Sequence, residues 1–325
     1  MTDSSIVFPA PGHSERRLLA FDAPILSDYE WPYFAITGAH DGPTLCVIAG
    51  IHGAEYPPID ALIRFCRGLD PATLRGRVLG VPVVNLPAFR ERTPFVCPRD
   101  GKNPNRVFPG KPDGTFTEVL AYHFFRKVIL SGDSLIDLHC GDLVEDLMPF
   151  SLLHQSGKQK VDETAQDLAV TFGLPYVIVE PPAGGAVAGS TDIAASAAGI
   201  PAVIAEAGGI GQLTPEAVGL QMRGLRRVMQ RLNMLKGDPE PLASAPTIMR
   251  GFAWVRAERG GFFRKAVRAG DTLKAGDSLG EMVDLWGEPV DTIASPVAGV
   301  VLFVTTSPAI ADNGLLVGIG QPEAV

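Results

Sequence analysis

The chain has 325 residues, of which 46% are hydrophobic, so it is long enough for one large domain and a small one, with a sizeable core. Its formal net charge of −8 leaves no basic excess to neutralise phosphates or lipid head groups, which argues against nucleic acid and membrane surfaces as partners. No apolar run approaches the roughly 18 residues of a membrane-spanning helix, and the N-terminus lacks the pattern of a signal peptide. We therefore expect a cytoplasmic protein; whether it forms a homo-oligomer is left open.

Short apolar runs alternate along the chain with longer segments of helical periodicity. The runs predicted as buried strands are residues 44–50, 78–85, 134–139, 176–180 and 202–209. The segments predicted as helices are residues 55–68, 116–130, 161–173, 190–199 and 214–235. This alternation indicates an α/β fold with a largely buried mixed or parallel sheet. Ligands of such sheets bind beyond the carboxyl ends of the strands.

The first of these strands runs into Gly-Ile-His-Gly-Ala-Glu at residues 50–55. A glycine-rich turn there puts His52 at the carboxyl edge of the sheet, and a helix beginning near Glu55 puts both side chains one turn apart. His139 ends another predicted strand, and Asp137 before it could orient its imidazole or cap a neighbouring loop. An isolated histidine is more often a surface or packed core residue, but this combination favours a metal site. Zinc prefers such nitrogen and oxygen ligands, so we predict one zinc ion per chain.

Glycines and prolines in DGKNPNRVFPG (residues 100–110) predict a loop with Asn105 and Arg106 at its centre. Arginine grips a carboxylate with two parallel hydrogen bonds, and a neighbouring amide adds a donor. The alternative is a surface arginine in a turn. Arg92 and Arg99 stand upstream, and either could polarise a substrate carbonyl.

Glu206 lies at the end of the predicted strand 202–209, within Ala-Glu-Ala-Gly-Gly. An unpaired carboxylate is costly to bury, so the position needs an explanation. Catalysis, metal contact and a salt bridge to a nearby arginine each provide one.

The chain changes character after a polar, Pro/Gly-rich linker at residues 237–247. Residues 248–325 have short β-type runs with Gly-Asp and Asn-Gly turns, and two segments, 267–284 and 294–320, repeat a strand–turn–strand pattern. The pattern is similar to the small β-barrels of biotinyl and lipoyl carriers. Those carriers present a lysine at a hairpin tip, and this chain has none after Lys274, so the resemblance is to a fold and not to a carrier function.

Four motifs in order, GxHGxE, NxNRxFPG, DLH and ExGG, resemble the succinylglutamate desuccinylase/aspartoacylase family, an offshoot of the zinc carboxypeptidases. The resemblance covers roughly residues 20–235, and the β-rich tail matches the second domain of such proteins. It implies a carboxypeptidase-like mixed sheet flanked by helices, at residues 1–237, and a small all-β, barrel-sandwich-like domain at 248–325.

The resemblance also implies a reaction, namely hydrolysis of the amide bond of an N-acyl amino acid to a carboxylate and a free amine. The implied zinc ligands are His52, Glu55 and His139. The other implied roles are general base for Glu206, carboxylate clamp for Asn105 and Arg106, and carbonyl polarisation for Arg92, with Arg99 in reserve. A metallocarboxypeptidase acting on peptides and a non-catalytic metal-binding protein on the same scaffold are the alternatives.

Two positions depart from the common family pattern. Pro104 replaces a leucine, which stiffens the loop but keeps the clamp residues. Cys140-Gly141-Asp142 replaces a small Ser-Gly-Gly type stretch. Because Asp142 adds negative charge close to the metal, we expect a shift towards a substrate with a positive group.

Overall fold

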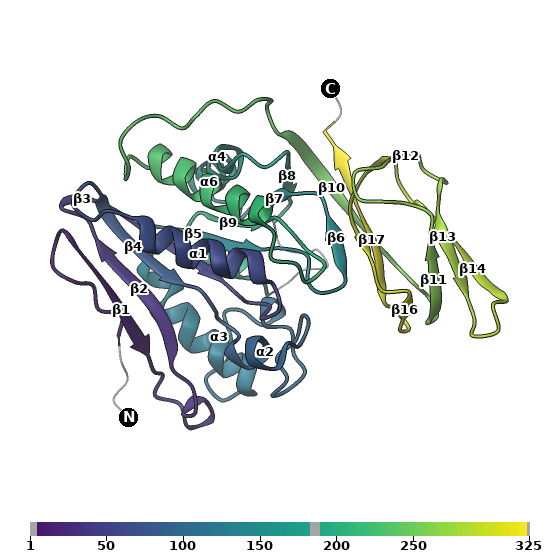
Figure 1. Ribbon diagram of the computed structural model, residues 1–325, viewed down its shortest axis with the longest axis horizontal. Coiled ribbons are helices and arrows are strands. Elements are labelled where there is room, and N and C mark those ends of the chain that lie inside the picture. Colours follow the sequence, from purple (N-terminus) through teal and green to yellow (C-terminus); the bar gives the residue numbers. More distant parts are fainter. Residues whose placement is uncertain (1–4, 183–188, 324–325) are drawn as a thin grey trace.

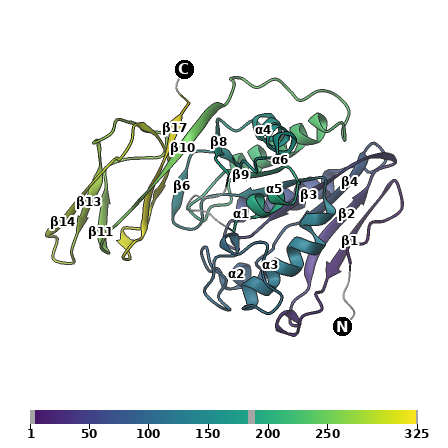
Figure 2. The same ribbon diagram turned by 180° about the vertical axis from the view of Figure 1, so that it is seen from behind.

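The computed structural model describes residues 5–182 and 189–323 and is built on a long mixed β-sheet with helices on both faces (Figures 1 and 2). The strands of the larger part are β1 (His13–Leu19), β2 (Trp31–Thr37), β3 (His40–Ala49), β4 (Arg75–Val81), β5 (Ser134–His139), β6 (Glu145–Leu147), β7 (Phe150–His154), β8 (Tyr176–Glu180) and β9 (Ala202–Glu206). The helices are α1 (Tyr56–Gly68), α2 (Leu86–Glu91), α3 (Phe116–Lys127), α4 (Gln159–Phe172), α5 (Thr191–Ala197) and α6 (Pro215–Arg231), with short 3-10 turns η1 (Pro24–Leu26), η2 (Pro104–Arg106) and η3 (Ile129–Ser131). The remaining strands are β10 (Thr247–Arg256), β11 (Gly261–Lys265), β12 (Thr272–Leu273), β13 (Ser278–Val283), β14 (Pro289–Ala294), β15 (Gly299–Thr305), β16 (Ala309–Ile310) and β17 (Leu315–Pro322).

The strand order of the main sheet is β1-β2-β4-β3-β5-β9-β7-β8-β10-β17-β15-β12, with β6 paired to β15. The central strands β4, β3, β5 and β9 are parallel, whereas β7 runs antiparallel to β9. The carboxyl ends of β3, β5 and β9 therefore meet at one edge of the sheet, where a ligand site is expected. The predicted α/β fold with a mixed sheet is confirmed.

The central strands are buried and mostly apolar, as is usual where helices cover both faces of a sheet. Leu45 to Ala49 in β3 are fully buried, and every residue of β5 is buried. Helices α1 and α6 pack together on one face, and α3 and α5 lie on the other (Figures 1 and 2). The predicted strands and helices of this part are all present. The short or edge elements β1, β2, α2, β6 and β7 were not predicted from the sequence.

The tail is all-β, as predicted. A separate antiparallel sheet, β14-β13-β11-β16, faces strands β10, β17 and β15 across a second hydrophobic core. At the β13–β14 hairpin, where a carrier domain presents its lysine, Leu285 and Trp286 are 92% and 91% exposed. No helix within the described ranges is long and apolar enough to cross a membrane.

The tail is joined to the larger part by strand pairing as well as by the linker. Strand β10 pairs in parallel with β8, and β15 pairs antiparallel with β6 (Figure 1). Residues 232–246 contain no helix or strand, and each part has its own hydrophobic cluster. Domain boundaries at 237 and 248 remain our proposal. The shared sheet fixes the tail strands beside the edge where β3, β5 and β9 end.

Candidate active site

The turn after β3 brings His52 and Glu55 to the carboxyl edge of the sheet. Gly50 has a φ of +63°, and a Cβ there would lie 3.0 Å from the Cα of Val83, so glycine is required for the turn. Glu55 is the N-cap residue of α1, which begins at Tyr56. The helix therefore starts where the sequence predicted, and it holds Glu55 one turn from His52.

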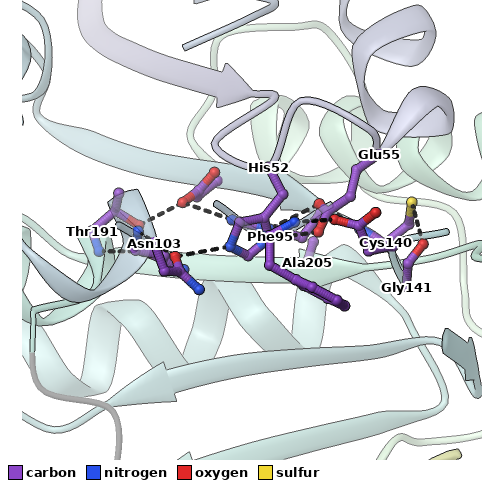
Figure 3. Close-up of polar contacts among 12 residues, drawn as sticks. His52, Glu55, Phe95, Asn103, Cys140, Gly141, Thr191 and Ala205 are labelled. Carbon is purple, nitrogen blue, oxygen red and sulfur yellow. Dashed lines mark hydrogen bonds and ion pairs between the residues drawn. The ribbon is translucent and has the colours of Figure 1, made fainter. Parts of the chain in front are cut away.

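His52, Glu55 and His139 form one cluster, with a ligand atom of each within 4.8 Å of the others. Nδ1 of His52 lies 2.6 Å from one carboxylate oxygen of Glu55, and Nδ1 of His139 lies 2.9 Å from the other. The backbone N–H of Cys140 donates to the same carboxylate at 3.1 Å. Figure 3 shows His52 and Glu55 turned toward one another, with Cys140 beside Glu55. Two imidazole nitrogens and a carboxylate facing one point are a donor set that fits a zinc ion.

Electrostatic coupling within the cluster is strong. Burial raises the pKa of Glu55, but the positive charges of His139 and His52 outweigh it and lower the pKa to about 2. Burial lowers the pKa of His139, but Asp137 and Glu55 raise it well above its usual value. The cluster therefore favours an ionised Glu55 carboxylate with positive charge next to it.

A second layer of polar contacts orients both imidazoles. Nε2 of His139 forms an ion pair with Asp137 at 3.1 Å. Nε2 of His52 lies within hydrogen-bond distance, 3.1 Å, of the side-chain oxygen of Asn103 (Figure 3). Asp137 therefore faces the imidazole and not a loop, which decides between the two roles that the sequence left open. Such partners fix the ring that presents its other nitrogen to a metal.

Thr191, at the start of α5, connects this layer to the loop at residues 100–110. Its hydroxyl donates to Asp137 at 2.5 Å, and its backbone N–H donates to the side-chain oxygen of Asn105 at 3.0 Å. The oxygen of the Asn105 amide is thereby used, so its NH2 group is the one that can donate to a ligand. Nη1 of Arg106 donates to the backbone oxygen of Asn105 at 2.7 Å. Both residues line the same cavity as the cluster.

Glu206 ends β9 directly opposite His139 in the parallel ladder, and it also lines the cavity. Desolvation raises its pKa well above the usual value; His139 opposes this effect, and Glu55 and Glu145 add to it. Glu145, which the sequence did not single out, lines the cavity too. Burial and the charge of Glu55 raise the pKa of Glu145 to about 7.

Arg92 and Arg99 do not line the cavity. Arg92 is exposed and ends α2 in a left-handed conformation with a φ of 57°. Arg99 is exposed, and its guanidinium lies 5.9 Å from the centre of the Phe116 ring. Among the described residues, the arginines that do line the cavity are Arg106 and Arg256. Sequence reasoning missed Arg256 because nothing in its local pattern distinguishes it from other strand residues.

Asp142 is fully buried and is not among the residues that line the cavity. Its carboxylate accepts hydrogen bonds from the backbone N–H groups of Phe95, at 2.8 Å, and Leu143, at 2.6 Å. Asp142 therefore fixes the loop that carries Phe95. The expectation that its charge would meet a positive substrate group is not supported.

The cavity has a volume of about 480 Å³, within the usual range for small-molecule sites. One side carries the His52–Glu55–His139 cluster, Glu206, Asn105 and Arg106, and the other is made by residues of the tail strands.

The sequence pattern of the succinylglutamate desuccinylase/aspartoacylase catalytic domain matches residues 41–232, which hold the whole cluster and Glu206. The chain belongs to this family. A member from Halomonas elongata, N-alpha-acetyl-L-2,4-diaminobutyric acid deacetylase, is 32% identical over 253 residues, which are 75% of this chain and 72% of that protein. Membership places the chain among the hydrolases of linear amides.

Solved structures of the family share the fold along nearly the whole chain. The ectoine utilization protein EutE (DoeB) from Ruegeria pomeroyi, with product bound, has a TM-score of 0.86 and 26% identity, covering 97% of each chain. A succinylglutamate desuccinylase from Silicibacter sp. TM1040 has a TM-score of 0.85 and 24% identity, covering 98% of each chain. The two-part architecture, including the β-rich tail, is thus that of the family.

We expect Thr191→Val to weaken zinc binding by up to about tenfold, less than the roughly 10–100-fold that follows loss of a direct partner of a metal ligand, because Thr191 acts through Asp137. Valine keeps the shape of threonine but removes the hydroxyl that donates to the fully buried Asp137. Zinc affinity measured by chelator competition tests this, with Thr191→Ser, which keeps the hydroxyl, as the control. Equal affinities in the two variants would show that the hydroxyl does not position the site.

Proposed function

We propose that the protein hydrolyses the amide bond of an N-acyl amino acid, with one zinc ion held by His52, Glu55 and His139. The observation that carries the proposal is that this cluster, Glu206 and the Asn105–Arg106 pair all line one cavity. The activity named for the Halomonas relative, removal of an acetyl group from an amino acid derivative, supports the same class of reaction.

A zinc ion bound at this cluster would polarise the amide carbonyl and lower the pKa of a water molecule toward about 7. Glu206 would accept the proton of the attacking water and deliver it to the departing nitrogen, a task suited to a carboxyl group whose pKa is raised by burial. Asn105 and Arg106 would hold the carboxylate of the amino acid and aim the amide at the metal. We assign no step to Arg92, because its exposed position outside the cavity does not support carbonyl polarisation.

We expect Arg106→Ala to lose about 10–100-fold in kcat/KM for N-acyl amino acids and far less for the matching N-acyl amines. The amines lack the carboxylate, and a charge-assisted bidentate contact is worth roughly 1.5–3 kcal/mol. Kinetics with one such substrate pair measure the difference. Arg99→Ala is the matched control, since it removes an arginine of the same region that does not line the cavity. Equal losses on both substrates, with a lowered melting temperature, would reduce Arg106 to a structural residue.

The test of the function as a whole is acid release from a panel of N-acyl amino acids by zinc-loaded and by chelator-treated protein. Zinc-dependent release of acid is expected. A metallocarboxypeptidase would instead release C-terminal residues from peptides, although the tail strands close one side of the cavity to a long peptide. Bound zinc without hydrolysis on the whole panel would favour a non-catalytic binding protein.

A further inference from the structure

The far wall of the cavity is one face of four neighbouring strands from both parts of the chain. Strand register places Leu147, Phe303, Gly318 and Trp254 opposite one another, in that order, across β6, β15, β17 and β10. Because opposite residues of a ladder share a face of the sheet, these four positions form a row. All but Gly318 are lining residues of the cavity.

The row is apolar and largely aromatic, and Phe252 extends it. The ring centre of Trp254 lies 4.9 Å from that of Phe252 and 5.5 Å from that of Phe303. A Cβ at Gly318 would lie 2.1 Å from an atom of the Phe303 ring and 2.6 Å from one of Phe252. The missing side chain at Gly318 is therefore what lets the two phenyl rings lie against β17.

The apolar row continues into the larger part of the protein and reaches the catalytic groups. Phe150 lies opposite Glu206 in the β7–β9 ladder, and Leu152 lies opposite Ile204. Phe150, Leu152 and Ile204 line the cavity as well. An apolar strip thus begins beside Glu206 and ends at Trp254.

A second, polar row runs beside the apolar one on the same wall. Thr305, two residues after Phe303, lies opposite Glu145 of β6. Arg256, two residues after Trp254, lies on the same face of β10. Arg106 and Arg256 both line the cavity, and the positive charge of Arg256 adds to desolvation in lowering the pKa of Arg106. We therefore place the carboxylate clamp at the polar end of this wall.

The proposed function constrains how a substrate lies in the cavity. Its carboxylate is held by Arg106, in a cavity that Arg256 also lines, and its acylated nitrogen is directed to the metal cluster and Glu206. The side chain of the amino acid leaves the same carbon atom as the carboxylate and the nitrogen, so it is the group on that carbon left to lie along the apolar strip.

We propose that the substrates are N-acyl derivatives of large apolar amino acids, aromatic or branched, whose side chains pack against Trp254, Phe252 and Phe303. The inference rests on the proposed deacylase function and adds the class of amino acid to it. A large apolar side chain would remove these rings from water, which stabilises the complex in proportion to the area buried. A small or charged side chain would gain little there, or would lose its hydration.

The experiment compares kcat/KM of the zinc-loaded protein for five N-acetyl L-amino acids: phenylalanine, leucine, alanine, aspartate and 2,4-diaminobutyrate. We expect kcat/KM for the phenylalanine and leucine derivatives to exceed kcat/KM for the alanine derivative by about tenfold or more. One methylene-sized contact in an apolar pocket already discriminates between substrates by about 10–200-fold. In Trp254→Ala the phenylalanine-to-alanine ratio should fall about tenfold. Trp286→Ala, which removes a tryptophan exposed at the β13–β14 hairpin, should keep the wild-type ratio.

Each outcome decides something. A wild-type preference for the aspartate or diaminobutyrate derivative would overturn the inference and leave the proposed function standing. Hydrolysis of none of the five would count against the inference, whereas the proposed function is overturned separately, by zinc-loaded protein that releases no acid from the whole N-acyl panel. An unchanged ratio in Trp254→Ala would show that the aromatic strip does not contact the substrate. If Trp254→Ala is unstable, Trp254→Leu keeps an apolar side chain in place. The phenylalanine-to-alanine ratio of Trp254→Leu should fall as well, and an unchanged ratio counts equally against the inference.

Discussion

Glu206→Gln should keep its zinc and lose at least about a hundredfold in kcat on any accepted N-acyl amino acid. Glutamine keeps the size of the side chain and can hydrogen-bond, but it cannot accept a proton near neutral pH. General acid–base catalysis by a positioned side chain typically contributes about 10²–10⁴-fold. The raised pKa of Glu206 and its place beside His139 are the features that fit it for this role.

The measurement is the turnover rate, together with zinc content, of Glu206→Gln and of the matched variant Glu145→Gln. Glu145 is the sharpest comparison because it lines the same cavity and also has a raised pKa, to about 7. A loss of less than about tenfold in Glu206→Gln, or ~1.4 kcal/mol of barrier, would mean that another group is the base. A larger loss in Glu145→Gln would identify that group.

His139→Ala should lose most of its zinc and, with it, nearly all hydrolysis. The variant removes one of the three residues that we propose as ligands and leaves Glu55 and His52 to hold the metal alone. A catalytic zinc site needs three protein ligands, so two leave the ion weakly bound. Metal analysis of the purified variant checks this, and circular dichroism checks that the fold remains.

His154→Asn is the control for His139→Ala. His154 is also a buried histidine paired with a carboxylate, at 2.6 Å from Asp192, but it does not belong to the cluster. Its variant should therefore keep one zinc ion per chain. Full retention of zinc in His139→Ala as well would disprove the ligand assignment.

The sequence by itself determined the α/β core and brought His52, Glu55 and His139 together in one cluster that could hold a metal ion. His52 and His139 follow apolar strand patterns, and the ends of parallel strands meet at one edge of a sheet without further information. Glu55 joined them because the helix that follows His52 begins at Tyr56, as the periodicity predicted. These inferences succeeded because each depends on a local pattern of a few residues.

The sequence was less informative about roles that depend on which groups a side chain contacts in the folded protein. Arg92 was chosen from its position before the NPNR loop, but α2 ends there with a left-handed turn that leaves the side chain exposed. Asp142 was interpreted as charge near a substrate, but its carboxylate is used by the backbone N–H groups of Phe95 and Leu143. The hydrogen bond to Phe95 joins residues 47 positions apart in the chain, so no local sequence pattern predicts it.

Only the tertiary structure decided what closes the cavity. Strand β7 enters the sheet antiparallel to β9, and β6 pairs with β15, so Glu145 lies opposite Thr305, 160 positions further along the chain. Trp254 and Arg256 reach the same wall through the register of β10 with β17. The sequence of each of these strands does not tell which partner strand it meets. Register across the junction is set by packing of the complete fold, and it is this register that places an aromatic wall opposite the His52–Glu55–His139 cluster.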